Sequence, residues 1–403
     1  MKRNHQDAAT PIKVAFVMPD MVLGGVEKAL LSLLDVMEGK NFQVSLLLFR
    51  KKGELLSNIP EWVKIEVLKG AGKLEVVRRN TSFLLSKLGN KRLFFISKAI
   101  FHKFGGRIKT GKLKNDQRFD VVIAYKDGTA TWYTSQSNLA PVKIAFIHTD
   151  FKRAGYNPIS QRKVYEEFNR IYCVSNASKE NFLSLLPQFS DKTEVMLCAV
   201  NTRRIRDMAK KGEGFPDQFT GLRILTVGRI SHEKGIDKAV DIVIKLKAAQ
   251  YNVRWYIVGD GAEKEALVRK AAKLQIDTDI VFLGQLANPY RLLSDCDIYV
   301  QPSNYEGYCI SLAEARSLYR TIVACDFAGA REQIKDGKTG IITGMSVDEL
   351  YRGIEKVIKD KSLRSFLQHN LQEDDAQSNF QSDAFCSNIR TAISDVILKA
   401  GIE

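Results

Sequence analysis

The sequence predicts an α/β fold with two domains of similar size that face one another across a cleft. Short apolar segments of strand length alternate with amphipathic segments of helical periodicity, which is the pattern of parallel sheets covered by helices. A length of 403 residues is long for one domain and suits two. A polar, charged stretch at residues 201–220 separates two series of such segments. Ligands of these sheets bind beyond the carboxyl ends of the strands.

The two series place the elements and the domain boundaries. In the first series we expect strands at residues 13–18, 44–49, 121–124, 143–147, 170–174 and 195–198, and a helix at 26–37. In the second series we expect strands at residues 224–227, 255–258, 280–283, 298–300 and 322–324, followed by a helical pattern at 348–402. The predicted parts are an N-terminal domain (1–200), a linker region (201–220) whose first part is helical, a C-terminal domain (221–375) and a helical tail that packs back on the N-terminal domain (376–403).

Composition narrows the class of protein. The net charge of +15 indicates an acidic partner, which is a nucleic acid, an anionic membrane or an anionic substrate. The six cysteines show no C-x-x-C spacing, so we expect reduced thiols in a cytosolic protein. No signal peptide is visible at the polar start, and no run of about 18 apolar residues is present to span a membrane.

Two short stretches carry the chemistry. Arg229 and Lys234 follow the predicted strand at 224–227, and two cations suit a diphosphate. Glu306 and Glu314 lie eight positions apart across a predicted loop and helix start. If Glu306 opens the helix, Glu314 lies about 12 Å further along at ~1.5 Å per residue. That span suits a nucleotide-sugar from hexose to ribose, whereas two carboxylates of a glycosidase lie ~5–9.5 Å apart.

Three further motifs each have a structural alternative. Gly24-Gly25 lies between the first strand and first helix, where the backbone can approach a phosphate, or it forms a tight turn. Gly259-Asp260-Gly261 follows a strand and suits a turn near a nucleotide, or a turn alone. His148 ends a strand and so lies on the ligand side, although a lone histidine is more often structural.

The sequence offers no convincing metal site. Asp295-Cys296-Asp297 has the D-x-D pattern of some metal sites, but it precedes the strand at 298–300 and so lies away from the ligand side. No other cluster of His, Cys, Asp and Glu has ligand spacing. We therefore expect neither a metal nor a cofactor.

These motifs together resemble the retaining glycosyltransferases of family 4, which have the GT-B fold of two facing Rossmann-like domains. The resemblance is densest between residues 224 and 340 and covers most of the chain, but residues 53–120 match little. It rests on Val227-Gly228-Arg229 with Lys234-Gly235, Val258-Gly259-Asp260-Gly261, Phe282-Leu283-Gly284, Pro302-Ser303, Glu306-Gly307, Glu314-Ala315, Asp336-Gly337-Lys338-Thr339-Gly340, Gly24-Gly25 and His148.

The resemblance implies a role for each matching residue. Arg229 and Lys234 would hold the donor diphosphate, Glu306 the donor sugar and Glu314 the ribose. His148 would contact the sugar near the reacting carbon, so His148, Arg229, Lys234 and Glu306 are the implied catalytic residues. The other implied donor-binding residues are Gly24, Gly25, Gly228, Gly259, Gly307, Tyr308, Cys309 and Ile310. Many relatives have Phe-Gly where this chain has Tyr308-Cys309, which leaves the identity of the donor sugar open.

The function implied is transfer, with retention and without a metal, of a hexose or N-acetylhexosamine from a nucleotide-sugar, expected to be a UDP-sugar, to a saccharide hydroxyl. The acceptor is expected to be lipid-linked, as in the synthesis of bacterial surface polysaccharide. One alternative is a nucleotide-sugar epimerase or hydrolase on the same scaffold, and another is a non-catalytic sugar-nucleotide binder. A nucleic-acid-binding protein would also suit the charge, but no aromatic-basic recognition motif supports it.

The segment 73–114, which begins at Lys73 and ends at Lys114, has a net charge of +11, which is most of the chain's net charge of +15. It contains twelve basic residues and one acid, interleaved with bulky apolar residues. Helices that lie in the lipid interface have this composition, and each basic residue near an anionic surface contributes about 1 kcal/mol. We therefore expect a cytoplasmic protein attached peripherally to the inner face of the membrane. The alternative is an ordinary amphipathic helix packed on the domain.

Overall fold

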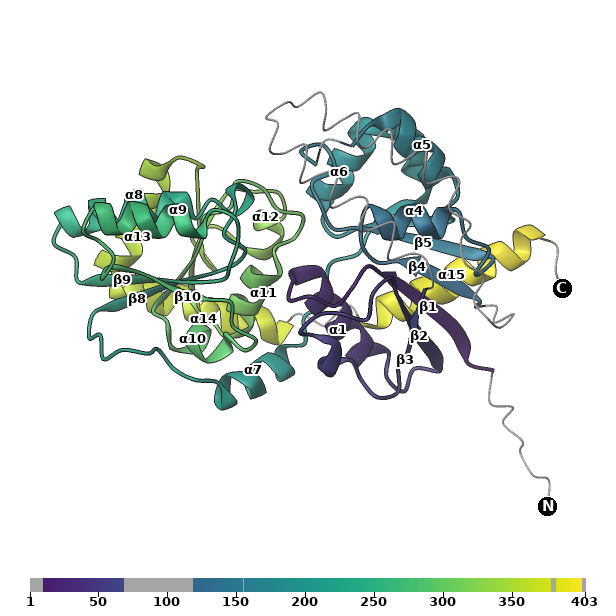
Figure 1. Ribbon diagram of the computed structural model, residues 1–403, viewed down its shortest axis with the longest axis horizontal. Helices are drawn as coiled ribbons and strands as arrows, with labels where there is room; N and C mark the ends of the chain where they lie inside the picture. Colours follow the sequence, from purple (N-terminus) through teal and green to yellow (C-terminus); the bar gives the residue numbers. More distant parts are fainter. Residues whose placement is uncertain (1–9, 69–118, 155, 378–381, 401–403) are drawn as a thin grey trace, which may run out of the picture. The chain divides into compact units, whose positions relative to one another are not determined.

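The structure is a computed structural model that describes residues 10–68, 119–154, 156–377 and 382–400 (Figure 1). The chain divides into two compact units, and each is described by itself. Unit 1 comprises residues 1–174, 178–199 and 381–403, and unit 2 comprises residues 175–177 and 200–380. Each unit is a parallel sheet with helices packed against it, the α/β class that the alternating segments predict.

Within the described residues, unit 1 contains a seven-stranded sheet in the order β3-β2-β1-β4-β5-β6-β7. Its strands are β1 (Ile12–Met18), β2 (Phe42–Leu48), β3 (Lys64–Val67), β4 (Val121–Ala124), β5 (Val142–Ile147), β6 (Arg170–Cys173) and β7 (Thr193–Val195). Its helices are α1 (Gly25–Met37), α4 (Thr129–Ser135), α5 (Pro158–Glu166), α6 (Asn176–Leu185) and α15 (Ser382–Ala400), with 3-10 turns η1 (Leu56–Asn58) and η2 (Pro187–Lys192). The strand order reverses between β1 and β4, so the carboxyl ends of these two strands mark the ligand side of unit 1.

Among the residues described for unit 2, a six-stranded sheet has the order β10-β9-β8-β11-β12-β13. Its strands are β8 (Leu222–Val227), β9 (Val253–Val258), β10 (Ile280–Gly284), β11 (Ile298–Gln301), β12 (Thr321–Cys325) and β13 (Ile341–Thr343). Its helices are α7 (Thr202–Lys211), α8 (Asp237–Ala248), α9 (Lys264–Lys273), α10 (Tyr290–Asp295), α11 (Ile310–Ser317), α12 (Ala330–Gln333), α13 (Val347–Lys359) and α14 (Lys361–Gln377), with the 3-10 turn η3 (His232–Lys234). Here the order reverses between β8 and β11.

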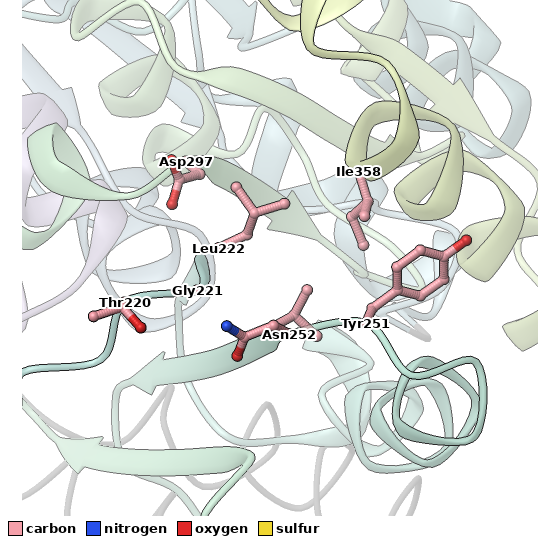
Figure 2. A pocket seen from close by; sticks show the side chains of 8 residues that line it. Thr220, Gly221, Leu222, Tyr251, Asn252, Asp297 and Ile358 are labelled. Atoms are coloured by element: carbon pink, nitrogen blue, oxygen red, sulfur yellow. The ribbon is translucent and has the colours of Figure 1, made fainter.

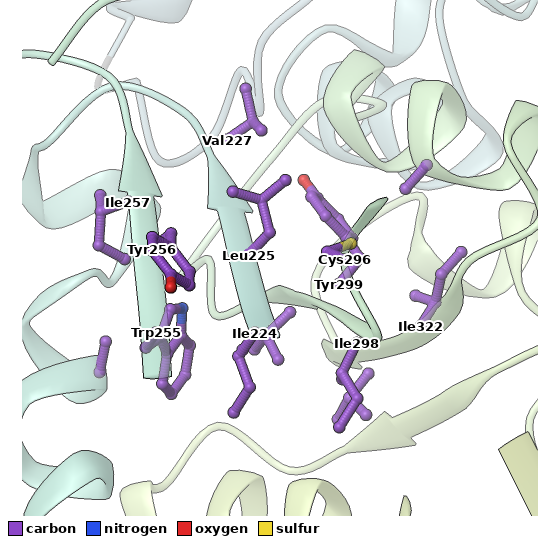
Figure 3. Packing of buried hydrophobic residues seen from close by; sticks show 14 of the residues in the cluster. Ile224, Leu225, Val227, Trp255, Tyr256, Ile257, Cys296, Ile298, Tyr299 and Ile322 are labelled. Atoms are coloured by element: carbon purple, nitrogen blue, oxygen red, sulfur yellow. The ribbon is translucent and has the colours of Figure 1, made fainter. Parts of the chain in front are cut away.

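The central strands of both sheets are apolar runs because helices cover both of their faces. Every residue of β4 is buried, and so are residues 14–18 of β1. In unit 2 the side chains of Trp255 and Tyr256 on β9 and of Tyr299 on β11 are fully buried in the core (Figure 3). The indole N–H of Trp255 donates to Thr226 Oγ1 at 3.0 Å, so this large side chain is buried without an unpaired polar atom.

Several predicted boundaries differ from the structure. The predicted strand at 195–198 is displaced, because β7 ends at Val195 and residues 196–198 are irregular. The prediction missed β3, whose charged residues break the apolar pattern, and β13, which has only three residues. The helix expected in the first part of the linker region is present as α7, whose buried Ile205 and Ala209 pack in the unit 2 core.

The C-terminal helices are divided between the units. Helix α14 belongs to unit 2, where Arg316 and Lys335 both form ion pairs with Asp374. Helix α15 belongs to unit 1, where it contacts α1 and β5 and where Asp395 pairs with Arg170. The chain therefore returns to its first unit at its end.

Candidate functional site

Lys234 and Glu306 form an ion pair at the carboxyl ends of the two central strands of unit 2. Lys234 ends η3, which follows β8, and Glu306 lies in the loop after β11, the neighbour of β8. Nζ of Lys234 donates to Oε1 of Glu306 at 2.5 Å, and the two side chains retain 19% and 7% of their exposure. Two residues predicted as site residues, 72 positions apart, thus meet where the strand order reverses.

The ion pair fixes the charge of Lys234. Burial is the largest single influence and lowers the pKa of Lys234, but the neighbouring acidic groups, Glu306 first among them, and the hydrogen bond to Glu306 together outweigh burial and raise the pKa above its ordinary value. Lys234 therefore remains an ammonium at neutral pH. The site holds a permanent positive charge beside a carboxylate.

Arg229 differs from Lys234 because its side chain is exposed. No hydrogen bond or ion pair of the Arg229 guanidinium is found within the described part of the chain. A guanidinium with no protein partner at the end of β8 is available to an anionic ligand, and its planar fork suits phosphate oxygens.

Two glycines allow the backbone around this site to approach closely. Gly259 has φ 151°, and a Cβ there would lie 1.8 Å from the carbonyl oxygen of Gly228. Gly235 is left-handed at φ 61°, and its Cβ would lie 2.3 Å from the carbonyl oxygen of Pro302. Larger residues at either position would push the loops after β8, β9 and β11 apart.

The loop between Glu306 and α11 departs from the expectation that Glu306 opens the helix. Helix α11 begins at Ile310, so Glu306 lies four residues before it, and the distance worked from a helical rise does not apply. Glu314 is on α11 and is 2% exposed, and its Oε1 accepts the hydroxyl proton of Tyr290 at 2.7 Å. The structure thus places Glu314 on the unit 2 core side with a neighbour on α10.

The predicted sugar-pocket backbone is held by side chains on either side. The carbonyl oxygen of Gly307 accepts from Ser175 Oγ at 2.7 Å, and the carbonyl oxygen of Tyr308 accepts from the Gln333 amide. Cys309 caps α11 in the left-handed region, with φ 69° and ψ 82°. That conformation favours glycine, which is the residue that many relatives have there, and costs another residue about 1–2 kcal/mol.

In unit 1 the start of α1 is already occupied by a carboxylate. Gly24 is the N-cap and Gly25 the first residue of α1. A Cβ on Gly24 would lie 2.4 Å from Glu27 Oε2, and Glu27 Oε1 is paired with Lys126. The free N–H groups expected at Gly24-Gly25 therefore lie beside an anion from the helix itself, which a phosphate at this position would have to displace.

His148 lies directly after β5, between aromatic rings. Its ring centroid is 4.8 Å from that of Tyr125 and 6.0 Å from that of Phe146, and Cys198 Sγ is 3.8 Å from Nδ1. Burial, aided by the positive charge of Lys126, lowers the pKa of His148 to about 3. The imidazole is therefore neutral at physiological pH.

Asp127 joins His148, although the sequence analysis did not select it. Its Oδ2 accepts from the backbone N–H of His148 at 2.9 Å, and burial raises its pKa to about 7. Asp127 Oδ1, His148 Nε2 and Thr149 Oγ1 are buried polar atoms without hydrogen-bond partners among the described residues. Such atoms are costly unless a ligand or water satisfies them, so they are candidates for contact with a polar ligand. The sequence could have indicated Asp127 through its position, because it lies shortly after β4, one of the two strands at which the strand order of unit 1 reverses.

The residues that the sequence analysis set aside as a metal motif have structural partners. Asp295 Oδ2 accepts from Arg291 Nε at 2.7 Å, and Asp297 Oδ2 accepts from the backbone N–H of Arg223 at 2.8 Å. Asp297 also lines a pocket of about 400 Å³ at the amino ends of β8 and β9 (Figure 2), on the edge of the sheet opposite to Lys234. Its other lining residues are Thr220, Gly221, Leu222, Tyr251, Asn252, Val253 and Ile358.

The described residues contain no metal-binding cluster, no membrane-spanning helix and no disulfide. In this part of the chain no three or more His, Cys, Asp or Glu residues are placed to hold a metal ion. The helices that the structure describes include none that is long and apolar enough to cross a bilayer. All six cysteines lie in the described ranges, and none forms a disulfide.

Comparison with known proteins gives a family match for part of the chain and a fold for nearly all of it. Residues 216–374, which lie within unit 2 and make up less than half of the chain, match the sequence model of the family "Glycosyl transferases group 1". The chain has the GT-B fold: Anabaena Alr3699/HepE, solved with UDP-glucose, superposes with a TM-score of 0.70 at 18% identity, covering 95% of this chain and 100% of that chain. TarM superposes with a TM-score of 0.69 at 14% identity, covering 96% of this chain and 99% of the other.

Curated relatives match at the level of sequence as well. An N-acetylgalactosamine-N,N'-diacetylbacillosaminyl-diphospho-undecaprenol 4-alpha-N-acetylgalactosaminyltransferase of Campylobacter jejuni is 26% identical over 192 residues, which is 46% of this chain and 51% of that protein. The capsular polysaccharide biosynthesis glycosyltransferase CapM of Staphylococcus aureus is 26% identical over 210 residues, 51% of this chain and 54% of that protein. The chain thus spans about half the length of these relatives.

Proposed function

We propose that this protein is a glycosyltransferase that moves a hexose or N-acetylhexosamine from a UDP-sugar to a hydroxyl of a saccharide acceptor, with retention of configuration. The observation that carries the proposal is the meeting of Lys234 and Glu306 at the switch point of unit 2, beside the exposed Arg229, which has no partner among the described residues. The site lies within the region that matches the group 1 glycosyl transferases. It offers cations for a diphosphate and a carboxylate for sugar hydroxyls.

Each donor group has a proposed partner. Arg229 and Lys234 hold the diphosphate, and Glu306 accepts a hydrogen bond from a sugar hydroxyl. Glu314, held beside Tyr290, is assigned to the ribose. Gly228 and Gly259 let the backbone of the two loops approach the nucleotide. In this proposal the sugar side of the unit 2 site is lined by the remaining predicted donor residues of that unit, Gly307, Tyr308, Cys309 and Ile310.

The acceptor is assigned to unit 1. His148 is neutral, and among the described residues no hydrogen-bond partner is found for the buried atoms His148 Nε2, Asp127 Oδ1 and Thr149 Oγ1. These atoms match the hydrogen-bonding needs of saccharide hydroxyls near the reacting carbon.

In the reaction the bond from the anomeric carbon to the diphosphate oxygen breaks, and a bond to the acceptor oxygen forms. Negative charge grows on the departing diphosphate, and the fixed charges of Arg229 and Lys234 stabilise it without a metal ion. Removing one such contact should cost about 10²–10³ in rate. The proton of the acceptor hydroxyl passes to the departing phosphate, so the acceptor attacks on the face that the phosphate leaves.

The setting proposed is bacterial surface polysaccharide, with a lipid-linked acceptor at the inner face of the membrane. The names of the Campylobacter relative and of CapM, which mention diphospho-undecaprenol and capsular polysaccharide, support this setting. The anionic membrane surface would be bound by the basic segment from Lys73 to Lys114, which lies outside the described residues. Flotation with liposomes tests this: binding should require anionic lipid, weaken in high salt and fall when Lys91, Arg92, Lys98 and Lys103 become glutamate.

A panel of nucleotide-sugars tests the proposed function itself. The true donor at 100 times its dissociation constant should raise the free energy of unfolding by about 2.7 kcal/mol, which thermal shift detects. The stabilising donor is then supplied in radiolabelled form with membrane extract. Label in the saccharide or lipid fraction supports a transferase, free sugar indicates a hydrolase, a changed nucleotide-sugar indicates an epimerase, and binding without turnover indicates a non-catalytic binder. Anomeric coupling constants of the product distinguish retention from inversion.

A further inference from the structure

A chain of buried polar side chains leads from the interior of unit 2 to Glu306. The hydroxyl of Tyr299 donates to Gln301 Oε1, and Ser311 Oγ donates to the same oxygen at 3.3 Å. Gln301 Nε2 then donates to Ser303 Oγ at 2.8 Å, and Ser303 Oγ donates to Glu306 Oε1 at 2.9 Å. Tyr299, Gln301 and Ser303 are all fully buried, so these groups exchange no hydrogen bonds with bulk water.

The direction of these hydrogen bonds is determined by the chemistry of the groups. The Gln301 carbonyl oxygen accepts two hydroxyl protons, so its amide nitrogen faces Ser303 and donates. Because Ser303 Oγ already accepts from that amide, its own proton points to the carboxylate of Glu306. The buried amide therefore fixes Ser303 as a donor.

The two oxygens of Glu306 are consequently unlike. Oε1 receives both Lys234 Nζ at 2.5 Å and Ser303 Oγ at 2.9 Å. Oε2 has no hydrogen bond within the described part of the chain, and it is not among the fully buried atoms that lack partners. The carboxylate is thus held through one oxygen while the other stays open to a ligand.

We propose that Gln301 and Ser303 are positioning residues that hold the Glu306 carboxylate with Oε2 presented to a hydroxyl of the donor sugar. This inference rests on the proposed function, in which Glu306 contacts the sugar. Neither residue contacts the donor itself. Their effect is confined to recognition of the sugar, since the diphosphate is held by Arg229 and Lys234.

The test compares binding of UDP with binding of the UDP-sugar that stabilises the parent most, either UDP-glucose or a UDP-N-acetylhexosamine, by isothermal titration calorimetry. Ser303→Ala should weaken UDP-sugar binding about 10-fold, the size of one hydrogen bond to a charged group, and leave UDP binding within about 2-fold. Ser303→Thr, which keeps the hydroxyl, should recover most of the loss. Gln301→Met should likewise weaken UDP-sugar binding and leave UDP binding nearly unchanged.

Thr226→Val is the matched control. Thr226 is a fully buried hydroxyl on the neighbouring strand β8 that donates to the carbonyl oxygen of Val300 at 2.7 Å and does not contact Glu306. Its loss should lower thermal stability without changing the ratio of the UDP-sugar affinity to the UDP affinity. Ser303→Ala that weakens both ligands equally, or neither, overturns the positioning role.

A second readout separates this inference from the proposed function. If the parent binds UDP but no UDP-sugar, the proposed function fails, and urea unfolding of Ser303→Ala, Glu306→Gln and the double variant decides the positioning role. Losses in unfolding free energy that are not additive support the hydrogen bond from Ser303 to Glu306. Additive losses overturn it.

Discussion

The buried ion pair of Lys234 and Glu306 gives a quantitative prediction for three variants, Lys234→Met, Glu306→Gln and the double variant. Each single change removes the charge of one partner and leaves the other charge uncompensated in a site where the side chains of Lys234 and Glu306 are 19% and 7% exposed. Breaking such a pair by removing one partner costs about 3–5 kcal/mol, whereas replacing both partners costs much less. The expected order of stability is parent, double variant, then the single variants.

The magnitude follows from the contact. Two unit charges 2.5 Å apart attract by roughly 6–7 kcal/mol at an effective dielectric constant of about 20, and desolvation of both charges offsets much of this gain. Because Lys234 is partly exposed and Ser303 still donates to Glu306, we expect a loss near the lower end, about 3 kcal/mol, for Lys234→Met. Glu306→Gln should lose less, about 2 kcal/mol, since its amide oxygen still accepts from Lys234.

Urea unfolding followed by circular dichroism measures the free energies. We expect the loss in the double variant to fall more than about 3 kcal/mol short of the summed single losses, which leaves it smaller than either single loss. Transfer activity should fall at least about 100-fold in all three variants, because restored stability does not restore the charges. Additivity within about 0.5 kcal/mol would refute the ion pair as a coupled unit.

Three further predictions follow from the site. Burial raises the pKa of Asp127 from 3.8 to about 7, so the folded protein binds this proton more tightly than the unfolded chain and loses stability as pH rises between those values. In Asp127→Asn the melting temperature should change less with pH over that range. A dependence on pH as steep as that of the parent would contradict the burial of this carboxyl. The backbone of Cys309 is left-handed at φ 69°. The free energy of unfolding, measured in urea, should therefore stay within about 1 kcal/mol of the parent in Cys309→Gly and fall by about 2 kcal/mol or more in the β-branched Cys309→Val. Equal losses in the two variants would show that the backbone is not strained there. Transfer should survive EDTA because Arg229 and Lys234 supply the positive charge, whereas loss of activity that magnesium or manganese restores would count against this phosphate site.

The sequence predicted most strands of the two sheets because buried strands leave local patterns. Unbroken apolar runs such as Val121–Ala124 identify strands that are buried on both faces, and a short edge strand such as Lys64–Val67 has no such run. Arg229, Lys234 and Glu306 were selected because they lie in loops that follow strands and match a family motif.

The residues that were missed depend on contacts between distant segments. Gln301 was not selected, and Ser303 was noted only within the motif Pro302-Ser303 and without a role. The fold shows that Gln301 donates to Ser303 and that Ser303 donates to Glu306. Glu27 approaches Lys126 across 99 positions, and this pair changes the expected free start of α1. Spacing within the chain gives no measure of these contacts, because loops and crossover helices set them.

The central claim is that unit 2 presents Glu306 to the sugar of a nucleotide donor for transfer. The most direct test measures transfer of radiolabel from the best-binding UDP-sugar to a saccharide acceptor by the parent and by Glu306→Gln, with UDP affinity measured on the same samples. The account predicts that the parent labels the acceptor, and that Glu306→Gln transfers at least about 100 times more slowly while binding UDP as the parent does. A folded Glu306→Gln that transfers at the parent rate, or a parent that binds the donor and labels no acceptor, would contradict it.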